Sequence, residues 1–189
     1  MIIDPLHTSI ILLGSNLGDK FKLLNDAMNK LSHSAGKIKV TSSIYESQAW
    51  GFESDSTFFN AILVLSTPLD PWQLLKECQR IEMELGRERE PQSMDHESKT
   101  REYSSRTIDI DILDFDGLIT NTPTLILPHP KLHLRKFTLL PLQEVMPEWI
   151  HPILKVGVKE LLTNCNDIGE VKILPDISLF KANHDGNSL

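Results

Sequence analysis

The amino-acid sequence predicts an α+β fold whose core follows the order β-α-β-β-α-β. Three observations predict it: short runs that are apolar or alternate between apolar and polar residues, two longer stretches with apolar residues at helical spacing, and cap or turn residues between them. The 189 residues, 40% of them hydrophobic and 24% charged, suit one domain with one substantial core. We expect residues 1–175 to form this domain and residues 176–189 to be a polar, flexible tail.

The first half of the core is predicted to contain a strand, a helix and a second strand. Residues 9–13 form an apolar run that ends at Gly14, as expected of a buried strand followed by a turn. Asp19 can cap the next helix, which Gly36 ends. Apolar residues recur along this helix at helical spacing: Phe21, Leu24, Met28 and Leu31. Apolar and polar residues then alternate over 38–44, which predicts a strand with one buried face.

The second half of the core repeats this pattern, with a strand expected over 59–65 and another over 107–115. Between them, Asp70 and Pro71 are typical of a helix start, a cap followed by proline at the first helical position. An apolar stripe follows: Leu74, Leu75, Cys78, Ile81 and Leu85. The order of elements is that of a ferredoxin-like fold, an antiparallel sheet with helices packed on one face.

The last third of the chain is predicted to add a hairpin, short helices and one more strand. Asp116 and Gly117 are typical of a hairpin turn leading into residues 118–119. We expect helices near 141–145 and 158–162, and a strand over 171–174.

Charge and cysteine usage exclude several classes of protein. A net charge of -7 argues against a broad surface for nucleic acid or anionic membranes. Cys78 and Cys165 are far apart and belong to no metal-binding motif, so we expect neither a disulfide nor structural zinc. No apolar run approaches the roughly 20 residues that span a bilayer, and the first residues do not resemble a secretory signal. We therefore expect a cytoplasmic protein.

Two acidic residues on the last core strand form the sharpest chemical motif. Asp109 and Asp111 are two residues apart, so on a strand both project from the same face. Adjacent carboxylates repel each other unless a cation lies between them, and a site with only oxygen ligands suits Mg²⁺ that also binds substrate phosphates. Taken alone, the pattern is better explained by a solvated polar face.

A long polar stretch precedes this motif and carries several arginines. Residues 87–105 are too hydrophilic for a core and too long for a simple connection, so they are a candidate lid. Arg87, Arg89 and Arg106 flank the stretch and could bring positive charge to a polyphosphate. A solvated loop with scattered charge explains it equally well.

Aromatic and amide side chains elsewhere could bind a flat heterocycle. Phe58 and Phe137 could stack on its two faces, and the Asn60 amide can both donate to and accept from an aminopyrimidine edge. Each phenylalanine taken singly is more typical of a core. His129, His133 and Arg135 could contact phosphate, although a histidine in a proline-rich loop is more often structural.

Seven short blocks occur in an order that is specific as a set. They are Leu-Gly-Ser-Asn-Leu-Gly (13–18), Tyr-Glu-Ser-Gln-Ala-Trp-Gly (45–51), Phe-Phe-Asn-Ala (58–61), Gln-Arg-Ile-Glu-Met-Glu-Leu-Gly-Arg (79–87), Ser-Arg-Thr-Ile-Asp-Ile-Asp-Ile-Leu (105–113), Leu-Pro-His-Pro (127–130) and Arg-Lys-Phe (135–137). Together they resemble the 6-hydroxymethyl-7,8-dihydropterin pyrophosphokinase family of folate biosynthesis. The resemblance covers about residues 9–142.

The resemblance implies a reaction and roles for individual residues. Members of the family move the terminal diphosphate of ATP to the pterin hydroxymethyl group and release AMP. Asp109 and Asp111 would hold two Mg²⁺ ions, and Arg87 and Arg106 would support catalysis. The residues expected to bind the pterin are Ser47, Gln48, Trp50, Phe58, Asn60 and Phe137. Those expected to contact ATP are Gln79, Glu82, Arg89, Tyr103, Ile112, His129 and Arg135. ATP and the pterin would be the partners of a monomer, with no nucleic acid and no membrane.

Two other functions remain open. One is a different Mg²⁺-dependent nucleotidyltransferase, although in that class the Gly-Ser turn and the acidic pair lie close in sequence, whereas here almost the whole domain separates Gly14 from Asp109. The other is a non-catalytic ferredoxin-like module that binds a ligand. Such a module would need neither the paired acids nor the loop with its flanking arginines.

Overall fold

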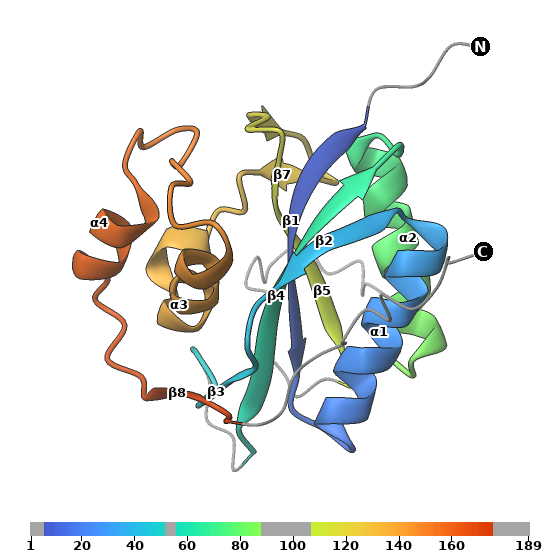
Figure 1. The fold of residues 1–189 in the computed structure, drawn as a ribbon, viewed down its shortest axis with the longest axis horizontal. Coiled ribbons are helices and arrows are strands. Elements are labelled where there is room, and N and C mark those ends of the chain that lie inside the picture. The colour runs from blue at the N-terminus through green and yellow to red at the C-terminus, as the bar shows by residue number, and fades with distance from the viewer. Residues whose placement is uncertain (1–5, 52–55, 88–106, 176–189) are drawn as a thin grey trace, which may run out of the picture.

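The computed structural model describes residues 6–51, 56–87 and 107–175. Within these residues, six strands form an antiparallel sheet in which β5, β1, β4, β3 and β8 lie side by side, while β2 pairs with the other end of β4 (Figure 1). The strands are β1 (His7–Ser15), β2 (Lys37–Thr41), β3 (Tyr45–Ser47), β4 (Phe58–Thr67), β5 (Asp109–Phe115) and β8 (Val171–Ile173). The pairing order of the core strands confirms the ferredoxin-like prediction.

Two helices cover one face of the sheet, α1 (Lys20–Ser34) and α2 (Pro71–Glu84) (Figure 1). Both predicted caps form. Asp19 accepts a hydrogen bond from the backbone N–H of Lys22, and Asp70 accepts from the first turn of α2 while the Gln73 side chain accepts from the Asp70 N–H. These reciprocal bonds satisfy amide groups that a helix start would otherwise leave without partners, and so fix where α2 begins.

The C-terminal helices cover the opposite face. They are α3 (Lys136–Val145) and α4 (Val158–Thr163), preceded by a short 3₁₀ helix, η1 (Leu132–Leu134) (Figure 1). Ile10 and Leu12 of β1 pack toward this layer, whereas Ile11 and Leu13 pack toward α1 and α2. Because β1 is buried on both faces, its sequence is a continuous apolar run rather than an alternating one.

The predicted strand over 38–44 is wrong in detail, because the chain forms β2 and β3 with a break between them. The register shifts between Ile38 and Val40, which leaves Val40 40% exposed instead of buried. At the break, Ser42 pairs with Ile62 in an unusual way. The Ser42 N–H donates to the Ile62 carbonyl, and the Ser42 hydroxyl oxygen accepts from the Ile62 N–H. A side chain thus replaces one backbone group of the ladder.

Two predictions for the last third also need correction. The turn at Asp116–Gly117 forms, but residues 118–119 do not continue as a strand along β5; instead β6 (Thr120–Asn121) pairs with β7 (Ile126–Leu127). The third helix begins at residue 136, not 141, and Pro141 lies inside it. Proline is tolerated best in a first turn, which is why it suggested a later start.

Some predictions concern segments outside the described residues, namely most of the candidate lid and the C-terminal tail after residue 175. In the part of the chain that the structure covers, no helix is both long and apolar enough to cross a membrane.

Candidate functional site

A row of directly paired residues crosses four strands at the end of the sheet where β5 begins. Asp109 of β5 lies opposite Gly14 of β1, which lies opposite Asn60 of β4. Asn60 in turn lies opposite Tyr45 of β3. Residues opposite each other in antiparallel strands share a face. The Tyr45 hydroxyl donates to Glu144 of α3 at 2.9 Å, so the row faces the α3 layer.

The acidic pair lies at one end of this row. Asp109 and Asp111 are half-buried, whereas Ile108, Ile110 and Ile112 are buried on the other face, as the period of a strand predicts. Among the residues that the structure describes, no cluster of three or more His, Cys, Asp or Glu side chains could hold a metal. Two carboxylates suffice for Mg²⁺, which takes its other ligands from water and substrate phosphates. The donor set therefore fits that ion.

An ion-pair network fixes the start of β5 against the end of α2. The Arg87 guanidinium donates to Asp109 Oδ1 at 2.5 Å and also to Glu82. Glu82 is 3% exposed and accepts a 2.8 Å bond from the Ile110 N–H, between the two acids. Burial, the largest influence, acts to lower the pKa of Arg87, but the carboxylates of Asp109 and Glu82 outweigh it and the pKa is raised. Arg87 is therefore held as a cation beside the acidic pair.

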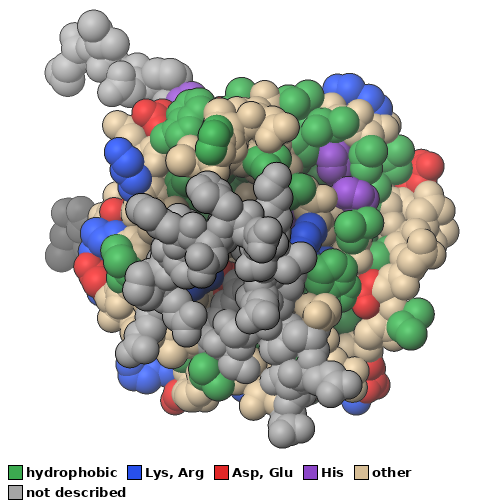
Figure 2. Space-filling view, turned by 180° about the vertical axis from the view of Figure 1, so that it is seen from behind, with side chains coloured by type: hydrophobic (Ala, Val, Ile, Leu, Met, Phe, Trp, Pro, Cys, Tyr) green, Lys and Arg blue, Asp and Glu red, His purple; other side chains and the backbone are tan. Residues whose placement is uncertain are grey.

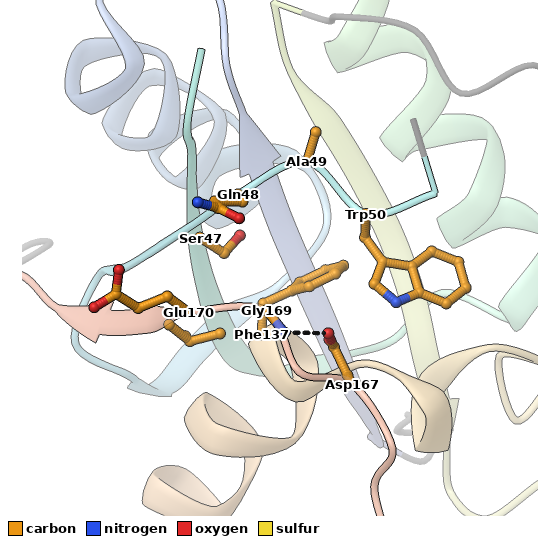
Figure 3. A pocket seen from close by; sticks show the side chains of 9 residues that line it. Ser47, Gln48, Ala49, Trp50, Phe137, Asp167, Gly169 and Glu170 are labelled. Carbon is orange, nitrogen blue, oxygen red and sulfur yellow. Dashed lines mark hydrogen bonds between the residues drawn. The ribbon is translucent and has the colours of Figure 1, made fainter. Parts of the chain in front are cut away.

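A pocket opens at the other end of the row. Its lining residues are Ser47, Gln48, Ala49, Trp50, Phe137, Asp167, Gly169, Glu170 and Val171. The Phe137 ring points toward Trp50, and the Asp167 carboxylate lies beside Gly169 (Figure 3). Next to the pocket, Asn60 is 2% exposed and donates through Nδ2 to Ser47 Oγ at 2.9 Å. This bond fixes the orientation of the amide.

A buried arginine stacks on the aromatic residues of this pocket. The Arg135 guanidinium carbon lies 4.8 Å from the centre of the Trp50 ring and 5.6 Å from that of Phe137. Arg135 is 5% exposed, so these cation–π contacts occur with little surrounding water. The Lys131 ammonium lies 5.7 Å from the Trp50 ring. Positive charge is thus concentrated at the aromatic side of the pocket, in a protein that is acidic overall.

A family model described as 7,8-dihydro-6-hydroxymethylpterin-pyrophosphokinase (HPPK) matches residues 10–147. The chain belongs to this family. A relative from Porphyromonas gingivalis named 2-amino-4-hydroxy-6-hydroxymethyldihydropteridine pyrophosphokinase is 41% identical over 141 residues, which are 74% of this chain and 90% of that protein. The folic acid synthesis protein fol1 of Pneumocystis carinii is 36% identical over 165 residues, 87% of this chain but only 21% of that protein.

Solved structures agree on the fold. A crystal structure of an HPPK-DHPS protein in complex with substrates aligns with a TM-score of 0.67 at 16% identity, over 85% of this chain and 43% of that one. The chain thus spans less than half of that two-part protein and nearly all of the P. gingivalis relative.

The structure places several other residues with roles implied by the HPPK resemblance. The His129 N–H donates to the Leu113 carbonyl of β5 at 2.8 Å, and its Nδ1 accepts from the Lys131 N–H. Gln79 is half-buried on α2, and Ile112 is 5% exposed, with its side chain in the core. Phe58 is half-buried and shares the face of Asn60. Arg89, Tyr103 and Arg106 lie outside the described residues.

His133, considered above as a phosphate contact, packs against a second histidine. Its ring meets that of His151 edge to face, with 5.7 Å between the centres, and His151 in turn contacts Trp149. Hydrophobic and histidine side chains gather on the α3–α4 side of the molecule when it is seen from behind (Figure 2). The structure therefore groups His133 with this apolar region.

Reasoning from the sequence missed two features of the site. One is Gly14 as the residue between Asn60 and Asp109, which only strand register reveals. The other is the contribution of residues 167–171 to the pocket. The predicted strand over 171–174 was the available signal, but nothing in the sequence indicated its partner.

Proposed function

We propose that this chain transfers pyrophosphate from ATP to the hydroxymethyl group of 6-hydroxymethyl-7,8-dihydropterin and releases AMP, a step of folate biosynthesis. Family membership supports the chemistry. The observation that carries the proposal is the paired row in which a buried amide and an acidic pair lie on one sheet face with only Gly14 between Asn60 and Asp109. A flat ring at the amide would thereby present its alcohol to phosphates held at the acids.

The pterin end would bind by stacking and by hydrogen bonds. Phe58 and Phe137 supply aromatic faces, and the Asn60 amide supplies a fixed polar group next to the pocket. Since Asn60 Nδ2 already donates to Ser47, its carbonyl oxygen is the group available to accept from the amino edge of the ring. Gln48 and Trp50 line the same pocket.

At the acidic pair, the protein would align the ATP phosphates and neutralise their charge. Asp109 and Asp111 would hold two Mg²⁺ ions, which polarise the triphosphate and offset its charge when bound. Arg87 lies at bonding distance from Asp109 and would exchange that contact for a phosphate oxygen. The same proposal includes a catalytic role for Arg106. It also includes ATP contacts by Gln79, Arg89, Tyr103, His129 and Arg135. Glu82 would act indirectly, by holding Arg87 and the Ile110 N–H in place.

The direct test is to incubate the protein with Mg-ATP and the hydroxymethyl dihydropterin and to separate the nucleotides. We expect free AMP and a pterin diphosphate in equal amounts. Formation of ADP instead, or no turnover by well-folded protein, would contradict the proposal.

The same assay separates the alternatives. A nucleotidyltransferase would release pyrophosphate and attach AMP to its substrate, while a non-catalytic module would bind ligand without consuming ATP. Membership of the HPPK family favours neither. The expected monomeric, cytoplasmic state stays a prediction, and light scattering of the purified chain tests the first part.

A further inference from the structure

The C-terminal segment supplies one wall of the pocket that the pterin would enter. Asp167, Gly169, Glu170 and Val171 line it together with Phe137 and Trp50 (Figure 3). These residues lie beyond the region matched by the family model, which ends at residue 147. The wall is therefore a property of this chain that family membership does not by itself assign.

Strand pairing holds this wall in place. Val171 pairs with Ser47 and Ile173 with Tyr45, so β8 extends the sheet beyond β3. The Leu174 N–H also donates to the Ile44 carbonyl at 2.9 Å. The segment before β8 is thereby held next to β3 and the loop after it, where the pterin contacts begin.

Asp167 connects this segment to the start of α3. Its Oδ2 accepts from the Lys136 N–H at 2.9 Å, and its Oδ1 accepts from the Gly169 N–H at 3.0 Å. Arg135, the residue at the cap position of α3, makes no capping bond with its own side chain. Asp167 supplies that acceptor from 31 residues further along the chain, and a carboxylate at a helix start also interacts favourably with the helix dipole.

The capped residue stands between two residues of the site. Lys136 follows Arg135, which stacks on Trp50, and precedes Phe137, whose ring lines the pocket. Fixing the Lys136 N–H fixes the first turn of α3, from which both side chains project. A loosened first turn would let the Phe137 ring tilt, and stacking is sensitive to tilt.

We propose that Asp167 is a positioning residue for pterin binding, which sets the Phe137 ring against the pocket by capping α3 from the C-terminal segment. The inference rests on the function proposed above. It assigns Asp167 no contact with the reacting atoms and no part in nucleotide binding.

The test compares three variants in steady-state kinetics and thermal unfolding. Asp167→Ala removes both acceptors, and we expect it to raise the KM for the pterin about five- to tenfold, while kcat and the KM for ATP stay within about twofold of wild type. Asp167→Asn keeps one acceptor oxygen, so its KM for the pterin should lie between those of wild type and Asp167→Ala. Asp70→Ala is the matched control, because Asp70 also accepts from two backbone N–H groups at a helix start, but at the far end of β4.

The outcomes separate positioning from general stability. Asp167→Ala and Asp70→Ala should each lower the melting temperature by roughly 2–4 °C, yet only the former should change the pterin KM. An unchanged pterin KM in Asp167→Ala, or an equal increase in Asp70→Ala, would overturn the inference. If Asp167→Ala fails to fold, Asp167→Asn decides by the same criteria. Wild-type protein that forms no AMP would instead refute the proposed function.

Discussion

At the scale of single residues, the proposed site depends on a position that has no side chain, Gly14. Gly14 lies between the amide that would bind the pterin and the first acid of the metal pair. A Cβ built on Gly14 would lie 3.4 Å from Asn60 Oδ1, at the edge of ordinary van der Waals contact. A larger side chain would stand in the path between the two substrates. A methyl group therefore fits at this position, whereas a longer side chain would not.

Substitution of Gly14 should therefore reduce catalysis in proportion to side-chain size. We expect Gly14→Ala to raise the pterin KM a few-fold and Gly14→Val to lower kcat/KM by about 100-fold or more, because productive geometry is lost when reacting groups are displaced by about 1 Å. Steady-state kinetics measures both. Gly157→Ala is the control, since among the described residues nothing apart from its chain neighbours comes within 4 Å of a Cβ built there. Near-normal activity of Gly14→Val would contradict this role.

At the scale of secondary-structure elements, the Glu144 carboxylate joins β3 to α3, and these elements form two sides of the pocket that the pterin would enter. Glu144 of α3 accepts from the Tyr45 hydroxyl at 2.9 Å through one oxygen. Its other oxygen accepts from the Ser43 N–H and the Ser43 hydroxyl, each at 2.9 Å. Ser43 belongs to the break between β2 and β3, so the break is anchored by a side chain of another layer. These bonds give the Ser43 N–H a partner that the interrupted strand does not supply.

Tyr45→Phe removes one bond of this tie and should lower the free energy of unfolding by about 1 kcal/mol at neutral pH. Burial, the largest cause, and the Glu144 carboxylate raise the pKa of Tyr45 above its ordinary value of 10.0. The folded state therefore holds the phenolic proton more tightly than the unfolded state. That contribution is complete below pH 10.0 and is lost as the pH rises above it.

The difference in unfolding free energy between wild type and Tyr45→Phe tests this sign directly. Denaturant titrations should give a constant difference up to about pH 9 and a smaller one above about pH 10. Taking the difference cancels the titration of lysines, which both proteins share. A difference that grows with pH would show that the hydroxyl is not held protonated by its surroundings.

At the scale of the whole molecule, local sequence patterns predicted most of the helices and strands but not how distant segments pair. Helix starts at Asp19 and Asp70 and the shared face of Asp109 and Asp111 follow from short-range rules, and the structure has them. The register that sets Asn60 opposite Gly14 depends on contacts between distant segments, which periodicity does not encode. The bond from the Lys136 N–H to Asp167 likewise joins segments 31 residues apart, so periodicity could not predict it.

The acidic pair links these scales through ligand binding, because a ligand that binds only the folded state stabilises the whole molecule. Mg²⁺ with a non-hydrolysable ATP analogue at about 100 times its Kd should add about 2.7 kcal/mol, or roughly 5–10 °C in melting temperature. Asp111→Asn should abolish turnover and most of this shift. Its melting temperature without ligand should stay close to that of wild type, since the substitution removes both the repulsion from Asp109 and the attraction to the Arg87 cation. Thermal unfolding with Mg²⁺ alone, with the analogue alone and with both measures how much each ligand raises the melting temperature. A full Mg²⁺-dependent shift in Asp111→Asn would remove the metal assignment, whereas a lower melting temperature without ligand would show that Asp111 has a structural role.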